Sequence, residues 1–299
     1  MKLLIITQKV DKNDPILGFF HRWIEEFAKH CESLVVVCLE EGAHNLPENV
    51  RVLSLGKEGG KSRLKYIFRF YKYIWQERKN YDKVFVHMNQ IYVILGALFW
   101  RLFKKKIGLW YTHGSVSPGL FFANIFTNKI FTASKESFRL TSVKIVITGH
   151  GIDIGFFFAE PGIVREKYWL SVGRLMQSKN HDVAIKEACA SKVPLHIAGN
   201  GPERTRLESF VQELGTEVHF LGPLSQLELR NEYRLAAKLI HRSKTGSLDK
   251  VTLEAAACGC PVDSSDPAIN SLPLSVEYVR KYHSLESLVP RILYNLKEQ

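Results

Sequence analysis

Apolar residues in the first half of the chain alternate between short continuous runs and runs at helical spacing. The run Leu3–Thr7 predicts a buried strand, and the apolar side chains between Phe19 and Phe27 predict a helix. Further strands are predicted at Leu34–Leu39, Arg51–Leu55, Val84–Met88, Ile107–Tyr111, Lys129–Thr132 and Lys144–Thr148, with helices at Leu64–Arg78 and Ile91–Phe103. Such alternation indicates a doubly wound parallel sheet.

The second half repeats this pattern. Strands are predicted at Tyr168–Val172, Leu195–Ala198, Val218–Leu221 and Leu239–His241, with helices at His181–Ala190, Glu203–Leu214, Leu227–Ala236, Val251–Ala257 and about Leu285–Leu296. Gly155, Pro161 and Gly162 interrupt the pattern between the halves. We therefore expect two domains, 1–158 and 159–299, facing across a cleft at the carboxyl ends of their strands. One option for the last helix (285–299) is to pack back on the first domain.

The positive charge is concentrated in the first domain. Residues 1–158 carry 23 Lys and Arg against 13 Asp and Glu, whereas residues 159–299 carry 18 against 17. This asymmetry predicts that the first domain meets an anionic partner. Nucleic acid is not favoured, because the sequence contains none of its recognition motifs.

Five cysteines without metal-type spacing suggest a reducing compartment. The apolar run at the N-terminus is too short for a signal peptide, and the run Ile91–Trp100 is too short to span a membrane. We expect a cytoplasmic protein, with attachment to a membrane surface as an option.

Two cations follow the strand Tyr168–Val172. In "SVGRLMQSKN" the strand ends at Gly173, where backbone can approach a ligand closely, and Arg174 and Lys179 come next. Arginine and lysine at the mouth of a cleft suit a diphosphate. The alternative is that both are ordinary solvated cations.

The stretch "AGNGPER" places Gly199 and Gly201 between a strand and a helix. It lacks the third glycine of a dinucleotide-binding turn, because Arg204 stands there, and no acidic ribose partner follows. The stretch argues against a dehydrogenase, and by itself it indicates only a tight turn. We include Gly199 and Gly201 among the candidate substrate-binding residues.

One histidine follows a strand of the first domain. His113, in "LWYTHGS", could carry a proton or bind a hydroxyl group, although a lone histidine is as often structural. The sequence has no D-x-D, so a metal-diphosphate site is not expected, and no Walker, G-x-S-x-G or H-E-x-x-H motif occurs.

Four stretches in order, "SVGRLMQSKN", "HIAGNGPE", "HFLGPLS" and "LEAAACGCPV", resemble the C-terminal domain of family 4 glycosyltransferases, which have the GT-B fold of two Rossmann-like domains. "VITGHGID" is similar to the interdomain loop of that family, and "THG" to its acceptor-side histidine loop. The resemblance is strongest in residues 144–262. It implies a retaining transferase that uses a nucleotide-diphosphate sugar, with no metal or other cofactor.

The resemblance also implies roles for individual residues. Arg174 and Lys179 match the pair that holds the diphosphate, and Glu254 matches a glutamate that binds the ribose. His113 matches a residue near the reacting sugar. The remaining candidates match the loop and helix start that meet the donor: Thr245, Gly246, Ser247 and Lys250. For Glu254 the alternative is a buried carboxylate satisfied by Lys250, four residues earlier.

Two departures from the family pattern keep other functions open. Gly246 occupies the position of the first of two paired glutamates, and the chain after Val262 is short. A degenerate, non-catalytic protein that binds a sugar nucleotide or a membrane surface is therefore an alternative. A GT-B-like sugar-nucleotide epimerase is a third, although it would need cleft carboxylates that the sequence does not offer.

Aromatic and basic residues are interleaved in two segments of the first domain, 64–79 and 100–106. The apolar face of the first segment comprises Leu64, Ile67, Phe68, Tyr71, Ile74 and Trp75. Such segments either cover the sheet with a solvated outer face or lie in a membrane interface. We therefore expect a glycan or lipid-linked acceptor and, optionally, an anionic membrane as partners.

Overall fold

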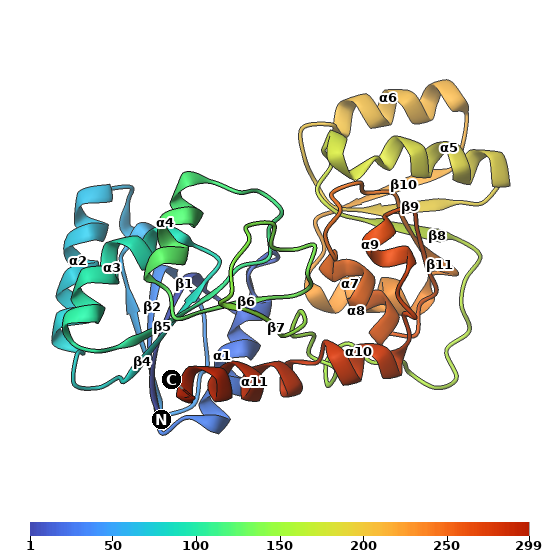
Figure 1. Ribbon diagram of the computed structural model, residues 1–299. Coiled ribbons are helices and arrows are strands. Elements are labelled where there is room, and N and C mark those ends of the chain that lie inside the picture. The colour runs from blue at the N-terminus through green and yellow to red at the C-terminus, as the bar shows by residue number, and fades with distance from the viewer. Residues whose placement is uncertain (299) are drawn as a thin grey trace. The chain divides into compact units, whose positions relative to one another are not determined.

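Two parallel sheets organise the chain. The computed structural model describes residues 1–298, which divide into two compact units (Figure 1). Unit 1 contains Met1–Gly151 and the residues from Leu285 onward, and unit 2 contains Ile152–Ser284. All strand pairs within each sheet are parallel in the described residues. The predicted α/β class with two parallel-sheet domains is confirmed.

The sheet of unit 1 has the order β3-β2-β1-β4-β5-β6-β7. Its strands are β1 (Lys2–Val10), β2 (Ser33–Glu41), β3 (Val50–Ser54), β4 (Lys83–His87), β5 (Lys106–Trp110), β6 (Lys129–Thr132) and β7 (Ile145–Ile147). The apolar run of β1 is fully buried from Leu3 to Ile6. A central parallel strand needs such a run because helices cover both of its faces.

Helices cover the two faces of this sheet differently. The helices of unit 1 are α1 (Phe19–His30), α2 (Arg63–Gln76), α3 (Gln90–Leu102), α4 (Pro118–Phe126), α11 (Leu285–Lys297) and a 3₁₀ turn, η1 (Lys57–Gly59). Leu3 and Ile5 pack with α1 and α11 in one core, whereas Leu4 and Ile6 pack with α2, α3 and α4 in another. This split follows from the alternation of side chains along a strand.

The apolar face predicted for helix α2 is largely exposed and does not cover the sheet. Of its six residues only Ile74 is buried, and Phe70 is the other buried side chain of this helix. Leu64 and Phe68 are 81% and 71% exposed, and Trp75 is 53% exposed. The helix contacts the sheet through a narrow strip around Phe70 and Ile74, and the wider aromatic stripe faces away from it.

The sheet of unit 2 has the order β10-β9-β8-β11-β12. Its strands are β8 (Trp169–Val172), β9 (Leu195–Ala198), β10 (Val218–Gly222), β11 (Lys238–His241) and β12 (Val262–Ser264). Its helices are α5 (His181–Ser191), α6 (Arg204–Leu214), α7 (Gln226–Leu235), α8 (Lys250–Ala257), α9 (Pro267–Asn270), α10 (Val276–Tyr282) and a 3₁₀ turn, η2 (Gln177–Lys179). This sheet brings the ends of β8 and β11 together, because the two strands are neighbours.

Besides the two 3₁₀ turns, the described residues contain one strand and three helices where none was predicted: β12, α4, α9 and α10. The three helices each begin with a capping side chain: Ser117 caps α4, Asp266 caps α9 and Ser275 caps α10. The expected short run after Val262 therefore contains a strand and two helices before α11.

The units divide between Gly151 and Ile152 rather than after residue 158. Residues 152–158 belong to unit 2 because Ile152 pairs with Ser284 and Phe157 is buried in the core around helix α8. Helix α11, the last helix, lies in unit 1, where Leu288 and Ile292 pack into the core that helix α1 covers.

Candidate functional site

The loop after strand β8 holds the two predicted diphosphate cations in different environments. Arg174 is exposed, and it forms no salt bridge with any other residue in the described range 1–298. Lys179 ends the turn η2 and is half-buried. The next residue, Asn180, has a left-handed backbone (φ 49°), and its Nδ2 donates to the carbonyl of Arg242 at 2.9 Å. This bond ties the lysine loop to the end of β11.

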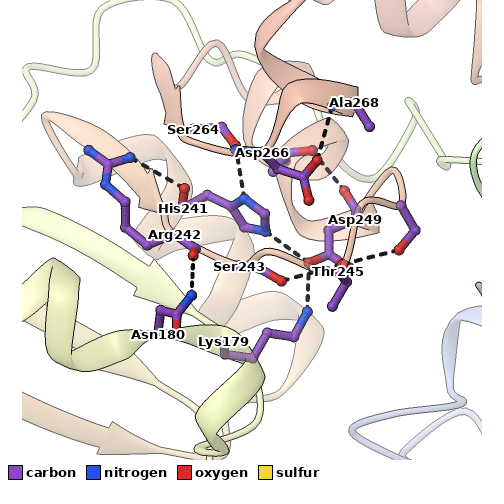
Figure 2. A network of polar contacts seen from close by, with 12 residues as sticks. Lys179, Asn180, His241, Arg242, Ser243, Thr245, Asp249, Ser264, Asp266 and Ala268 are labelled. Atoms are coloured by element: carbon purple, nitrogen blue, oxygen red, sulfur yellow. Dashed lines mark hydrogen bonds and ion pairs between the residues drawn. The ribbon is translucent and has the colours of Figure 1, made fainter.

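Lys179 belongs to a polar network at the carboxyl ends of β8, β11 and β12 (Figure 2). Its Nζ lies 2.6 Å from Oδ2 of Asp249, and Nε2 of His241 lies 2.8 Å from the same oxygen. On the other side of the ring, Nδ1 of His241 lies 3.0 Å from Oγ of Ser264. The network joins a basic residue that sequence reasoning selected to an acid and a histidine that it did not.

Asp249 is charged in this environment. Burial by itself would raise the pKa of Asp249, but the hydrogen bond from His241 and the ammonium of Lys179 outweigh it and lower that pKa well below its ordinary value. Asp249 occupies the N-cap position of helix α8, yet its side chain accepts no hydrogen bond from that helix. A capping aspartate contributes about 1 kcal/mol, so helix α8 forgoes this stabilisation.

The loop before helix α8, residues 243–247, is called the hydroxyl loop here, and hydrogen bonds within it and to Asp266 hold it in place. Oγ of Ser243 donates to Oγ1 of Thr245 at 3.4 Å, and Oγ1 of Thr245 lies 3.2 Å from Oγ of Ser247. Gly246 has a left-handed backbone (φ 62°), and its N–H donates to Oδ2 of the fully buried Asp266 at 2.9 Å. The position of the missing glutamate is therefore a glycine that a left-handed turn favours.

Glu254 has partners from its own unit. Its Oε1 lies 2.9 Å from Nζ of Lys250, and its Oε2 accepts from the hydroxyl of Tyr233 at 3.4 Å. The side chain is nearly buried, at 6% exposure. Burial and the neighbouring Glu254 raise the pKa of Tyr233 well above its ordinary value, so its hydroxyl stays a donor. This is the internal pairing that the structural alternative for Glu254 requires.

Three of the four candidate glycines of unit 2, Gly173, Gly199 and Gly201, lie where two loops come into close contact. A Cβ on Gly199 would lie 2.0 Å from the carbonyl oxygen of Gly173, and one on Gly201 would lie 2.3 Å from that of Leu175. Any larger residue would separate the ends of β8 and β9. Close packing therefore explains why positions 199 and 201 are glycine. At Gly173 the reason is the backbone, because its φ of 151° favours glycine.

His113 lies in unit 1, in the loop that follows strand β5. It is exposed, and its Nδ1 accepts from the backbone N–H of Ser115 at 3.1 Å. A neutral ring therefore carries its proton on Nε2. His87, which ends strand β4 of the same unit, is buried and stacks on Phe20 with 4.0 Å between ring centres. Of the two, His113 is the one with an accessible side chain.

Sequence reasoning missed Asp249, His241, Ser264 and Asp266. The signal was available, because His241 and Ser264 end two strands, and the ends of neighbouring parallel strands meet at one edge. Within residues 1–298, no three His, Cys, Asp or Glu side chains are arranged to hold a metal ion. No helix in this range is long and apolar enough to cross a membrane.

This geometry lies in a part of the chain that matches a known family. Residues 153–271 match the family model for glycosyl transferases group 1. Most of unit 2 is therefore similar to this family of glycosyl transferases. The matched range includes the Lys179–Asp249–His241 network, the hydroxyl loop and Glu254, and it excludes His113.

A curated protein is similar in sequence to part of this chain. The chain is 31% identical over 121 residues to the D-inositol 3-phosphate glycosyltransferase of Mycobacterium tuberculosis (strain ATCC 25618 / H37Rv), a match that covers 38% of this chain. The matched part spans 25% of the length of that relative.

Two solved structures resemble the chain over nearly its whole length. The Anabaena protein HepE, in complex with UDP, has a TM-score of 0.68 at 17% identity, covering 100% of this chain and 90% of HepE. Sucrose-phosphate synthase from Thermosynechococcus elongatus has a TM-score of 0.72 at 13% identity, covering 98% of each chain. At this identity the likeness concerns the fold, and the two-sheet architecture is that of the GT-B glycosyltransferases.

Proposed function

We propose that this protein transfers a sugar from a nucleoside diphosphate sugar to a glycan or lipid-linked acceptor. The observation that carries the proposal is the position of Lys179 beside the hydroxyl loop, within the range that matches the glycosyltransferase family. The UDP complex of HepE and the name of the curated relative, a D-inositol 3-phosphate glycosyltransferase, support the same substrate class. The proposal includes membership of family 4 of the glycosyltransferases, which the sequence motifs resemble.

Each candidate residue has a proposed role. Arg174 and Lys179 bind the diphosphate, because a guanidinium and an ammonium together offer bidentate and point-charge contacts. Thr245 and Ser247 contribute hydroxyl groups toward the donor, and Glu254 accepts from the ribose hydroxyls after exchange with Lys250. Backbone at Gly173, Gly199 and Gly201 lines the same side of the proposed donor site, and Gly246 lets the hydroxyl loop turn close to the donor.

The proposed reaction retains configuration and uses no metal. The bond between the anomeric carbon and the diphosphate oxygen breaks, and the acceptor oxygen bonds to the same face of that carbon. The acceptor proton passes to the departing diphosphate. Negative charge grows on the diphosphate as the bond breaks, so Arg174 and Lys179 lower the barrier by stabilising it. His113 is proposed to bind a hydroxyl of the reacting sugar.

Titration with nucleoside diphosphates tests this function directly. We expect UDP, GDP or ADP to raise the melting temperature, and calorimetry to give a Kd for the best of them. Glu254→Gln should weaken binding about tenfold, because a buried charged acceptor is lost. Glu232→Gln is the matched control, since Glu232 also accepts from a tyrosine, Tyr168, at 3.0 Å. Failure of all three nucleotides to bind would refute the proposal.

Specific contacts also favour the second candidate, a non-catalytic relative that binds the nucleotide only. Gly246 offers no carboxylate to a donor sugar, and Glu254 is already paired with Lys250. The two candidates differ in one measurement. A transferase releases UDP from a UDP-sugar in the presence of acceptor or slowly with water, whereas a binding protein leaves the donor intact over the same time.

Unit 1 is proposed to bind an anionic membrane from the cytoplasmic side. Helices α2, α3 and α4 contain no acidic residue. The exposed residues Leu64 and Phe68 on α2 are matched on α3 by Leu98 and Leu102, which are 78% and 77% exposed. The aromatic ring of Trp75 lies 6.2 Å from that of Phe99, which joins the two helices. An apolar surface flanked by cations suits the headgroup region of a bilayer.

Vesicle binding tests this surface. We expect binding to vesicles that contain phosphatidylglycerol, with little binding to pure phosphatidylcholine, because each cation near an anionic surface contributes about 1 kcal/mol. Raising the salt concentration should weaken the binding. Equal binding to both lipids would contradict an electrostatic contribution, and absence of binding at low salt would refute the membrane partner.

A further inference from the structure

The carboxylate of Asp249 is shared by two cationic or polar donors and by no backbone group of its own helix. Its Oδ2 accepts from Nζ of Lys179 at 2.6 Å and from Nε2 of His241 at 2.8 Å. An aspartate in the N-cap position ordinarily accepts from the first turn of the helix, and that bond is absent at α8. The side chain is thus directed toward Lys179 at the expense of capping.

The direction of each hydrogen bond in the network follows from chemistry. An ionised carboxylate only accepts, so Nε2 of His241 carries a proton. In the neutral ring Nδ1 then accepts from the hydroxyl of Ser264. That hydroxyl oxygen accepts in turn from the backbone N–H of Asp266 at 3.1 Å. A continuous chain therefore runs from the backbone after β12 to the ammonium of Lys179.

This chain of hydrogen bonds is largely shielded from solvent, and its residues come from separate elements. His241, at the end of β11, is 4% exposed, and the side chains of Lys179 and Asp249 are each 20% exposed. Figure 2 shows His241 at the centre, with Lys179 below it, Ser264 above it and Asp249 to its right. Contacts from three elements restrict the rotamers of a long side chain, whose ordering would otherwise cost entropy on ligand binding.

We infer that Asp249 and His241 are positioning residues that fix the ammonium of Lys179 for the donor diphosphate. This inference rests on the proposed function, because it assigns a purpose to the Lys179 side chain. An ammonium has three N–H donors. Asp249 takes one and sets the direction of the other two, which serve the anionic ligand. The carboxylate also balances the lysine charge, so recognition depends on aimed hydrogen bonds more than on net charge.

The same unit contains a matched ion pair for comparison. Nζ of Lys238 lies 2.6 Å from Oδ2 of Asp263, and the two side chains are 26% and 38% exposed. Residue types and distance equal those of Lys179 and Asp249. Asp263 has Arg242 as its second partner, at 3.0 Å, in place of a histidine. The pair connects β11 with β12 and makes no contact with Lys179.

Amine labelling tests the positioning without any nucleotide. Lysines held by a carboxylate react slowly with an acetylating reagent, and mass spectrometry reads each peptide separately. Asp249→Asn should raise the acetylation rate of Lys179 severalfold and leave Lys238 unchanged, whereas Asp263→Asn should do the reverse. His241→Gln should raise the acetylation rate of Lys179 to a smaller extent. Unchanged labelling of Lys179 in folded Asp249→Asn would overturn the inference.

A double-mutant cycle with UDP as the probe tests the consequence for the site. Lys179→Met should weaken UDP binding about a hundredfold, because the negative charge of Asp249 then lies beside the diphosphate with no cation to balance it. In the Asp249→Asn background the same change should cost about tenfold or less. The cycle of Lys238→Met and Asp263→Asn should leave the Kd for UDP unchanged.

The outcomes separate this inference from the proposed function. Coupling of about tenfold between residues 179 and 249 supports positioning, whereas additive effects on UDP binding overturn it and leave donor binding intact. A wild-type protein that binds neither UDP nor another nucleoside diphosphate refutes the proposed function itself. Melting curves for every variant show whether the protein is folded under the conditions of the assay.

Discussion

Helices α1 and α2 cover opposite faces of the same sheet and have similar aromatic-rich patterns, but they are buried very differently. In α1, Trp23 and Phe27 are 1% and 0% exposed. In α2, Trp75 and Phe68 are 53% and 71% exposed. The helical period alone therefore identifies an apolar stripe but does not say whether the sheet or another surface covers it.

The neighbours of each helix explain the difference. Helix α11 packs beside α1, so residues such as Leu288 and Ile292 enclose its apolar stripe. Helix α2 lies at the side of the sheet near β2 and β3, and its outer stripe borders a groove lined by Leu64, Lys65, Phe68 and Arg69. The comparison teaches that α1 stabilises the unit, whereas the outer stripe of α2 is available to a partner.

Removing a large side chain from each helix should separate these roles most strongly. Phe27→Ala should cost about 3–5 kcal/mol of unfolding free energy, because it leaves a cavity in a packed core. Phe68→Ala should change it by no more than about 0.5 kcal/mol, since the ring is already in water. Urea denaturation measures both. Comparable losses would mean that the two helices are equally buried.

The histidines His181 and His113 differ in burial in the same way as the aromatic residues of α1 and α2. Burial lowers the pKa of His181 to about 4 from an ordinary value of 6.5, whereas His113 is exposed. Between these values the unfolded chain binds a proton that the folded chain does not, so stability falls as pH falls from 6.5 to 4. The loss from His181 amounts to about 3 kcal/mol.

His181→Asn should remove that part of the pH dependence, because asparagine keeps a polar partner for Ser171, whose Oγ lies 3.0 Å from the ring. His113→Asn is the exposed control. Urea melts at several pH values between 4 and 7 measure the slope. An unchanged slope in His181→Asn would show that other groups govern the acid sensitivity.

Charge placed on the outer stripe of α2 should impair vesicle binding. The double substitution Phe68→Glu and Trp75→Glu should reduce partitioning onto phosphatidylglycerol vesicles about tenfold, because it replaces apolar contacts with charges that the surface repels. Leu227→Glu on α7, where Leu227 is 52% exposed, is the matched control in the other unit. Equal losses in both proteins would indicate a nonspecific effect of charge.

Fluorescence should give the smallest but most local effect. The chain has five tryptophans, and vesicle binding should shift the emission of Trp75 to shorter wavelength by removing water from its ring. The difference between the wild-type protein and Trp75→Phe isolates this signal. Trp23 is already shielded, so Trp23→Phe should leave the shift on vesicle addition intact. A shift that persists in Trp75→Phe would place the contact elsewhere.

Much of the fold was predictable because buried parallel strands are continuous apolar runs. The strands around Leu3–Ile6 and Leu195–Ala198 were predicted to within a few residues of their ends. The short helices α4 and α9 escaped, since four to nine residues show little periodicity. Their capping residues, Ser117 and Asp266, were the more informative signal.

The candidate site was predictable only in part. Lys179 and Glu254 were selected from motif positions, and the structure pairs them with Asp249 and Lys250 respectively. The pairing of Lys250 with Glu254 is local, four residues apart on one helix, and it was foreseen as an alternative. The pairing of Lys179 with Asp249 spans 70 residues and has no local signature.

The sequence by itself determined the alternation of strands and helices, the excess charge of the first domain and the positions of the polar residues that end each strand. These properties depend on spacing along the chain, which is fixed before folding. Only the tertiary structure decided which apolar stripe is covered, and that Asp249 turns from its own helix to Lys179. Both outcomes depend on strand order, because β8 lies beside β11 and thereby brings distant loops within hydrogen-bonding distance.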